Sequence, residues 1–240
     1  MMAVILAGGK GTRLKPFTMT IPKPLLPLGD LPILQIVIQQ LANAGVSRIV
    51  LTLGHMAHLF SAWVGDGKRW GVSIEAIQEE EPLGTAGSLR LIGNLEDDFI
   101  VMNGDLLTML DYGALLRFHV NRAAWGTIAL SRRTVEIDYG VVRSTADGNL
   151  EKYIEKPSIP YSVSMGINVL SRRCLAYIPA GKFDMPDLMM AMRAADKPVL
   201  CYETGCYWRD IGRFDDYQQA SEDFVQDPAR FLSRGKAACG

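Results

Sequence analysis

The sequence predicts an α/β protein: a Rossmann-like three-layer α/β/α sandwich around a mixed, mainly parallel sheet. In the first third of the chain, short apolar runs typical of buried strands alternate with segments of helical periodicity. Of the 240 residues, 48% are hydrophobic, enough for the core of one such domain. Further along, Asp147-Gly148-Asn149 separates two strand-like segments, which predicts a small antiparallel extension of the sheet.

The expected elements follow from hydrophobic periodicity and from Gly and Pro punctuation. Strands are expected at 3–6, 47–53, 72–77, 99–102, 125–132, 164–170 and 198–202, and helices at 33–41, 55–64, from 85, 112–122, 183–190 and 214–225. Asp184 is a candidate N-cap, with Pro186 in the first turn of its helix. We therefore expect one domain over residues 1–226, followed by a loosely held tail over 227–240.

Composition limits the classes of partner. The net charge of −1 gives no electrostatic case for a nucleic acid polymer or an anionic membrane. The four cysteines form no CxxC pair, so reduced thiols are expected rather than a zinc site. The sequence shows no signal peptide and no apolar run of about 20 residues, the length of a membrane span. We expect a cytoplasmic protein without a membrane partner.

The stretch from Ala3 to Pro27 is the most informative. A buried strand ends in Gly8 and Gly9, and Lys10, Arg13, Lys15 and Lys23 follow in a proline-rich loop. Glycines let backbone N–H groups approach a phosphate, and the lysines add positive charge, so the loop suits a polyphosphate. It is neither a Walker A loop, because Gly11 follows Lys10, nor a Rossmann fingerprint, because Leu14 stands where the third glycine would be.

LAGGKGTRLKPFTMTIPKPLLPLGDLPIL closely resembles the signature of the sugar-phosphate nucleotidyltransferases. The resemblance extends from about residue 2 to 225 with the motifs in family order. It implies transfer of a nucleoside monophosphate from an NTP to a sugar 1-phosphate, with release of pyrophosphate. It also implies catalytic roles for Arg13, Lys23 and Asp105, and nucleotide contacts from Leu6, Ala7, Gly8, Gly9, Gly11, Thr12, Glu79, Gly84 and Thr85.

EEEPLGTAGSLRL resembles the second family signature, a loop that holds the nucleobase. The family places a backbone contact at Gly84 and a base-facing side chain five residues earlier, at Glu79. A carboxylate only accepts hydrogen bonds, and guanine offers two adjacent donors, so Glu79 favours GTP. A shift of one residue would put Gln78 there instead, and uridylyl-transferring relatives also carry an acid in this loop.

Two aspartates resemble the metal ligands of the family. Asp105 follows the strand FIVM in Asn103-Gly104-Asp105, and Asp210 lies in Trp208-Arg209-Asp210-Ile211-Gly212. An Asp at the carboxyl end of a strand in an open α/β sheet lies where ligands bind. Carboxylates together with substrate phosphates suit Mg²⁺, which is therefore the expected cofactor.

Glu155-Lys156-Pro157 resembles the family's E-K-P triplet, in which Glu binds sugar hydroxyls and Lys binds the sugar phosphate. Gly166 and Asn168 match further sugar contacts, and Gly140 is another candidate. Without the family context, Glu155 and Lys156 would indicate a surface ion pair. The order of the motifs favours a binding role on a sugar-side antiparallel extension.

The function that we expect is sugar-1-phosphate nucleotidyl transfer, with GTP as the favoured NTP, for bacterial-type surface glycan precursors. The chain looks most like the short mannose-1-phosphate guanylyltransferases, but the sugar cannot be read from the sequence. Three alternatives stay open: uridylyl or thymidylyl transfer, a non-catalytic nucleotide-sugar sensor, and nucleotidyl transfer to a molybdopterin or to choline phosphate. Arg13, Lys23, Asp105, Lys156 and Asp210 are all present, which counts against a sensor. Relatives are often homo-oligomers, so self-association is also left open.

Overall fold

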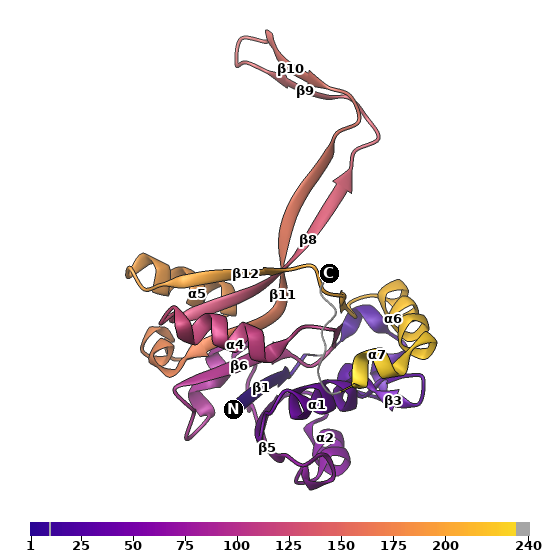
Figure 1. The fold of residues 1–240 in the computed structure, drawn as a ribbon, viewed down its shortest axis with the longest axis vertical. Helices are drawn as coiled ribbons and strands as arrows, with labels where there is room; N and C mark the ends of the chain where they lie inside the picture. Colours follow the sequence, from indigo (N-terminus) through magenta and orange to yellow (C-terminus); the bar gives the residue numbers. More distant parts are fainter. Residues whose placement is uncertain (10, 234–240) are drawn as a thin grey trace.

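The computed structural model describes residues 1–9 and 11–233, and it confirms the expected α/β sandwich (Figure 1). Seven strands form the central sheet in the order β12-β8-β11-β6-β1-β4-β5. Their bounds are β1 Met2–Ala7, β4 Arg48–Leu53, β5 Ser73–Gln78, β6 Asp98–Asn103, β8 Gly126–Glu136, β11 Ser158–Ser171 and β12 Val199–Thr204.

The sheet is mixed and mainly parallel, as predicted. β1 pairs in parallel with β4 and β6, β5 continues the parallel set beside β4, and β12 runs parallel to β8. Among these seven strands, only β11 is antiparallel to its neighbours, β6 and β8. The nearly continuous apolar sequence of β1 is explained by its central place, because both of its faces are covered.

Helices cover both faces of this sheet. On one face, α1 (Ile33–Asn43), α2 (Ala57–Val64) and α4 (Tyr112–Asn121) pack on the side chains of Ala3 and Ile5. On the other, α3 (Gly84–Gly87) and α5 (Met185–Ala194) pack on Met2 and Val4. The alternation of side chains along a strand thus gives each layer its own core. None of the helices in the described ranges is long and apolar enough to cross a membrane.

A third cluster of buried residues lies outside the sheet and fixes the loop after β1. It joins Leu14, Leu26 and Leu28 of the loop to Phe224 of α6 (Phe214–Gln226). The loop holds three short 3-10 turns, Thr12–Leu14, Phe17–Met19 and Lys23–Leu25, followed by the short strands β2 (Pro27–Leu28) and β3 (Leu31–Pro32). Two more short strands, β7 (Leu106–Thr108) and β13 (Trp208–Asp210), pair antiparallel with each other.

β8 and β11 are longer than predicted and continue beyond the sheet as a two-stranded ribbon, with the hairpin of β9 (Val141–Ser144) and β10 (Leu150–Ile154) at its far end. We call residues 131–164 the arm. Figure 1 shows it reaching well away from the body of the molecule. The predicted hairpin is therefore confirmed, but the antiparallel extension is long rather than small.

The segment after α6 differs from the sequence expectation of a loose tail. Asp227 caps a further helix, α7 (Pro228–Leu232), by accepting a hydrogen bond from the Arg230 N–H at 3.0 Å. Phe231 of this helix is only 4% exposed and packs on the rings of Tyr207 and Phe224. The tail prediction is thus wrong for residues 227–233, because one aromatic side chain anchors them. Residues 234–240 lie outside the described ranges.

Candidate active site

The glycine-rich loop at the end of β1 is held in shape by local contacts. Gly11 has φ +59°, and a Cβ there would lie 3.0 Å from the Thr18 methyl carbon. The Thr18 hydroxyl donates a hydrogen bond to the Gly11 carbonyl at 2.8 Å. A glycine is therefore required at position 11 both for the backbone conformation and for space. Of the other cations expected here, Lys15 is exposed and Lys10 lies outside the described residues.

A cavity of about 220 Å³ opens over this loop. Its lining brings together eight of the residues singled out from the sequence: Leu6, Ala7, Gly9, Gly11, Thr12, Arg13, Lys23 and Asp105. Pro24 and Gly212 complete it. The cavity thus combines glycine backbone with two cations and one carboxylate, a lining suited to a polyphosphate with a metal ion.

Lys23 and Asp105 form an ion pair inside this cavity. Lys23 Nζ lies 2.5 Å from Asp105 Oδ2, and Lys23 is only 8% exposed. Asp105 comes directly after the turn that ends β6, where the Gly104 N–H donates to the Leu6 carbonyl at 3.0 Å. The fold therefore holds both charges at the carboxyl ends of the central strands, where open α/β sheets bind ligands.

Asp210 lies beside Asp105, although the two are far apart in sequence. Asp210 pairs with Leu106 in the β13–β7 ladder, and the next residue, Ile211, donates its N–H to the Asp105 carbonyl at 3.1 Å. Desolvation, and after it the negative charge of Asp105, raises the pKa of Asp210, while Lys23 and Arg13 oppose the shift. The mutual repulsion of the two carboxylates would be relieved by a bound cation.

The donor set fits Mg²⁺. Within residues 1–9 and 11–233, no three His, Cys, Asp or Glu side chains gather as a metal cluster. Asp105 and Asp210 therefore supply two oxygen-donor groups, and phosphates and water would have to supply the remainder. Mg²⁺ is characteristically bound in this way, through one or two carboxylates together with substrate phosphates.

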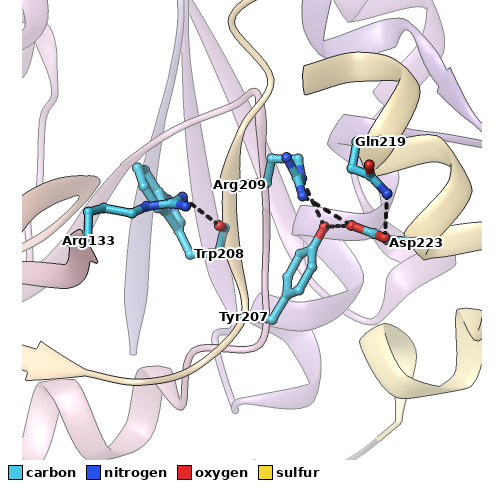
Figure 2. Close-up of polar contacts among 6 residues, drawn as sticks. All are labelled: Arg133, Tyr207, Trp208, Arg209, Gln219 and Asp223. Carbon is cyan, nitrogen blue, oxygen red and sulfur yellow. Dashed lines mark hydrogen bonds and ion pairs between the residues drawn. The ribbon is translucent and has the colours of Figure 1, made fainter. Parts of the chain in front are cut away.

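A polar network holds the strand that carries Asp210 (Figure 2). The Tyr207 hydroxyl donates to Asp223 Oδ2 at 2.5 Å, and Arg209 reaches the same oxygen at 3.4 Å. Gln219 donates to the other oxygen of Asp223 at 3.0 Å. Burial, and the hydrogen bond to Asp223, raise the pKa of Tyr207 to about 12, so its hydroxyl stays a donor. α6 thereby fixes one side of β13.

The opposite side of β13 is fixed through Trp208. Its indole Nε1–H donates to the Met165 carbonyl at 2.9 Å. Arg133, from the base of the arm, donates to the Trp208 carbonyl at 3.4 Å and lies over the indole ring at 5.2 Å (Figure 2). Trp208 therefore has a packing role and links β13 to β11 and to the arm.

Glu79, just after β5, faces the glycine turn. One carboxylate oxygen accepts the Leu83 N–H at 3.1 Å. The other lies 3.6 Å from the place where a Cβ of residue 8 would be. Burial raises the pKa of Glu79, and the Leu83 hydrogen bond acts against this shift. The alternative residue, Gln78, is exposed, so Glu79 is the side chain turned toward the loop.

The predicted nucleotide contacts Gly84 and Thr85 are tied to helix α5. Gly84 has φ +75°, and a Cβ there would lie 2.6 Å from the Phe183 carbonyl oxygen. The Thr85 N–H donates to Asp184 Oδ1 at 2.9 Å, and the Thr85 hydroxyl accepts the Met185 N–H at 2.7 Å. These contacts explain both residue types structurally, and a nucleotide contact at either position remains a prediction.

The predicted sugar-side residues fall into two groups, of which the first lies on the body. Gly166 has φ +70° at an irregularity in the β8–β11 ladder, and a Cβ there would lie 2.7 Å from Asn103 Nδ2. Asn168 is 6% exposed and pairs with Val101 of β6. Gly166 and Asn168 therefore lie next to the end of β6, which leads to Asp105.

The second group lies on the arm. Glu155 and Lys156 are exposed and connect β10 to β11. The strand from Ser158 to Gly166 spans eight residue steps, or about 26 Å at about 3.3 Å per residue. Gly140 packs so closely on the ring of Tyr153 that a Cβ would overlap it, which explains that glycine within the arm. The structure therefore does not bring Glu155, Lys156 and Gly140 to the cavity of the same chain.

Two further residues of the site were not assigned from the sequence. A Cβ on Gly212 would lie 3.2 Å from Asp210 Oδ2 and 3.5 Å from Arg13 Nη1, so this glycine lets Arg13 approach Asp210. Asn103 is the neighbour of Gly166. Gly212 follows Asp210-Ile211, and Asn103 precedes Gly104-Asp105. Their places in these two motifs were the sequence signal that could have identified them as site residues.

Comparison with known proteins decides the family. A family model described as nucleotidyl transferase matches residues 2–227. The chain belongs to this family. The match confirms the resemblance to the sugar-phosphate nucleotidyltransferases that the motifs suggested.

Three relatives illustrate the similarity of this nucleotidyltransferase to known proteins. Mannose-1-phosphate guanylyltransferase of Mycobacterium tuberculosis is 34% identical over 93% of the chain, and UTP–glucose-1-phosphate uridylyltransferase of Synechocystis is 32% identical over 92%. The chain spans 64% and 62% of the lengths of these two curated relatives. The crystal structure of HddC from Yersinia pseudotuberculosis is 28% identical with a TM-score of 0.70, covering 93% of this chain and 99% of that one. HddC complexed with GMP-PN has a TM-score of 0.68.

Proposed function

We propose that the chain transfers a nucleoside monophosphate from an NTP, with GTP preferred, to a sugar 1-phosphate. The observation that carries the proposal is the cavity in which the glycine loop, Arg13, Lys23 and Asp105 meet beside Asp210. Loop, cations and paired carboxylates together are what a triphosphate with Mg²⁺ requires. The products of the proposed reaction would be pyrophosphate and an NDP-sugar, which would be used as a precursor of surface glycans.

The chemistry follows from these groups. A sugar phosphate oxygen attacks the α-phosphorus, the new P–O bond forms, and the bond to the leaving pyrophosphate breaks in line. This oxygen is ionised at neutral pH, so no general base is needed. Arg13 and Lys23 stabilise the charge on the β- and γ-phosphates, and positioning supplies much of the remaining rate. When bound by Asp105 and Asp210, Mg²⁺ would offset the charge shared by the two phosphates.

The preference for GTP rests on Glu79. Its oxygen nearest Gly8 accepts no hydrogen bond within the described residues, and guanine offers the adjacent N1–H and N2 donors. The name of the M. tuberculosis relative and the HddC complex with GMP-PN support the same choice. Uridylyl transfer is the second candidate, because the Synechocystis relative, named for that reaction, is 32% identical.

A substrate matrix tests the proposal. ATP, CTP, GTP, UTP and dTTP are each combined with mannose, glucose, glucosamine and heptose 1-phosphates in the presence of Mg²⁺, and pyrophosphate is measured. We expect release with GTP to exceed that with the other NTPs. A preference for UTP or dTTP would overturn the guanylyl assignment. Nucleotide-sugar binding without pyrophosphate release from any pair would favour the sensor instead.

A further inference from the structure

The arm has one apolar face and one polar face. In the β8–β11 ladder, Val135 lies opposite Ile159 and Arg133 opposite Tyr161, and these side chains share one face. Thr134 opposite Pro160 and Arg132 opposite Ser162 form the other. Antiparallel ribbons show this alternation when one face is packed against something.

The apolar face is uncovered in the single chain. Val135 is 43% exposed, Ile159 42% and Tyr161 46%, and Tyr153 at the far hairpin is 60% exposed. An isolated two-stranded ribbon is marginally stable in water, and contiguous exposed apolar surface marks an interaction site. Both considerations favour a partner surface for the arm.

The base of the arm is fixed to the body by strand pairing and by side-chain contacts. The β8 strand is paired with β12 as far as Ser131, which lies opposite Thr204. Just beyond this point Arg133 contacts Trp208 on one face, and Arg132 forms an ion pair of 2.5 Å with Glu203 on the other. Strand pairing and contacts on both faces therefore hold the ribbon pointing outward (Figure 1).

The body offers a matching apolar surface beside the cavity. Phe17 and Phe214 stack with ring centroids 6.0 Å apart, yet they are 45% and 50% exposed. Met19, in the same turn as Phe17, is 62% exposed. This patch, which we call the loop patch, is formed by the loop that lines the cavity together with the start of α6, and it faces solvent in the single chain.

The cavity also lacks a cation for a second phosphate among the residues that the structure describes. Lys23 is already paired with Asp105, and Arg13 approaches Asp210. The family resemblance assigns the acceptor phosphate to Lys156, which the arm carries about 26 Å or more from Gly166. The body of one chain and the arm of the same chain thus hold complementary halves of a site that do not meet.

We propose that two copies of this chain exchange arms, so that Glu155 and Lys156 of each copy complete the sugar-phosphate side of the other copy's site. The apolar face of each arm packs on the loop patch of its partner. A two-fold axis makes both contacts at once, because an isologous dimer uses the same pair of surfaces twice. The inference about Lys156 rests on the proposed function, whereas the arm-mediated dimer does not.

The molar mass of the protein in solution tests whether it forms this dimer. The 240-residue chain is measured by size-exclusion chromatography with light scattering, as wild type, as Ile159→Asp on the apolar face, and as Ser162→Asp on the polar face of the same strand. We expect dimers for wild type and Ser162→Asp, and folded monomers by circular dichroism for Ile159→Asp. A monomeric wild type, or an Ile159→Asp dimer, would overturn the exchange.

Complementation tests the shared site. Asp105→Asn has an intact arm, and Lys156→Ala has an intact body. After the two variants are unfolded together and refolded as an equimolar mixture, half of the dimers are mixed, and each mixed dimer has one complete site. Measured well below the wild-type KM for the sugar 1-phosphate, the mixture should regain about a quarter of the wild-type rate, whereas Asp105→Asn alone is nearly inactive and Lys156→Ala alone keeps at most about a tenth. No gain in a mixture that contains mixed dimers would show that each arm serves its own chain. An inactive wild type that is nevertheless dimeric would contradict the proposed function and leave the interface standing.

Discussion

Lys23 illustrates how one residue serves both the fold and the site. It is 8% exposed and pairs with Asp105 at 2.5 Å. Removing one partner of a buried ion pair leaves the other charge uncompensated, so a simple deletion would mix stability with catalysis. An isosteric amide at Asp105 reduces this mixing, because it keeps the volume and one hydrogen-bond acceptor for Lys23 although it removes the negative charge.

Asp105→Asn should leave the fold intact and lower turnover at least about a hundredfold, the scale for loss of one key electrostatic group. The physical reason is loss of the negative charge that would hold the cation beside Asp210. Pyrophosphate release at saturating substrates measures this effect, and thermal unfolding checks the fold. Asp187→Asn, on the exposed side of α5, is the matched control and should keep wild-type turnover. Near-normal turnover in Asp105→Asn would rule out the metal assignment.

Glu79 should make GTP binding dependent on pH. Burial raises its pKa above the ordinary value for Glu of about 4.3. As the pH falls through this raised pKa, the carboxylate gains a proton and loses its capacity to accept both donors of guanine, so GTP binding weakens. Calorimetric titration of GTP at several pH values should show this loss in the wild type and in the exposed control Glu80→Gln. The Glu79→Gln variant should bind weakly throughout, and the same pH profile in this variant would contradict the assignment.

At the scale of an element, the loop after β1 depends on one backbone conformation. Gly11→Ala should lower the free energy of unfolding by about 1–2 kcal/mol, the cost of a left-handed conformation for a residue with a Cβ. Crowding against Thr18 adds to this cost. A Cβ added to Gly9 would meet no other atom within 4 Å, and the φ of Gly9 is not positive, so Gly9→Ala is the matched control for stability. Urea unfolding compares the two, and equal losses would show that the conformation at Gly11 is not what matters.

The helix α7 should contribute to stability through Phe231. Phe231→Ala removes a ring that is 4% exposed, and such truncations cost about 3–5 kcal/mol in well-packed cores. α7 has only five residues and can relax around the truncated side chain, so a loss near the lower of these two values is expected. Phe214→Ala provides a comparison with the same chemistry at 50% exposure and should cost less than about 1 kcal/mol. A negligible loss for Phe231→Ala would mean that α7 adds no stability to the domain.

At the scale of the whole molecule, the local spacing of apolar residues in the sequence was enough to predict the central sheet and its helices. β1 and α1 carry apolar residues at strand and helix spacing, and both lie where periodicity puts them. The cavity was also predictable, because its residues stand in three motifs that meet at the ends of neighbouring strands. The length of the arm and the anchoring of α7 were not predictable. They depend on contacts between segments that are distant in sequence, such as the packing of the Phe231 ring on the Tyr207 ring, and a local sequence pattern does not predict such contacts.

The last prediction concerns Lys156, which lies on the arm, far from the cavity of its own chain. Lys156→Ala should raise the KM for the sugar 1-phosphate at least about tenfold, because a hydrogen bond to a charged group contributes about 1.5–3 kcal/mol. The KM for the NTP should stay within about twofold, since the triphosphate is bound by the loop, Arg13 and Lys23. Lys152→Ala, on β10 of the same arm, is the matched control for the loss of one exposed positive charge. Equal effects of Lys156→Ala on both substrates would show that the arm residue does not select the acceptor. An effect confined to the acceptor would mean that the arm binds the second substrate. Because Arg133 and Arg132 fix the base of the arm, binding of that substrate would then depend on how these contacts orient the arm.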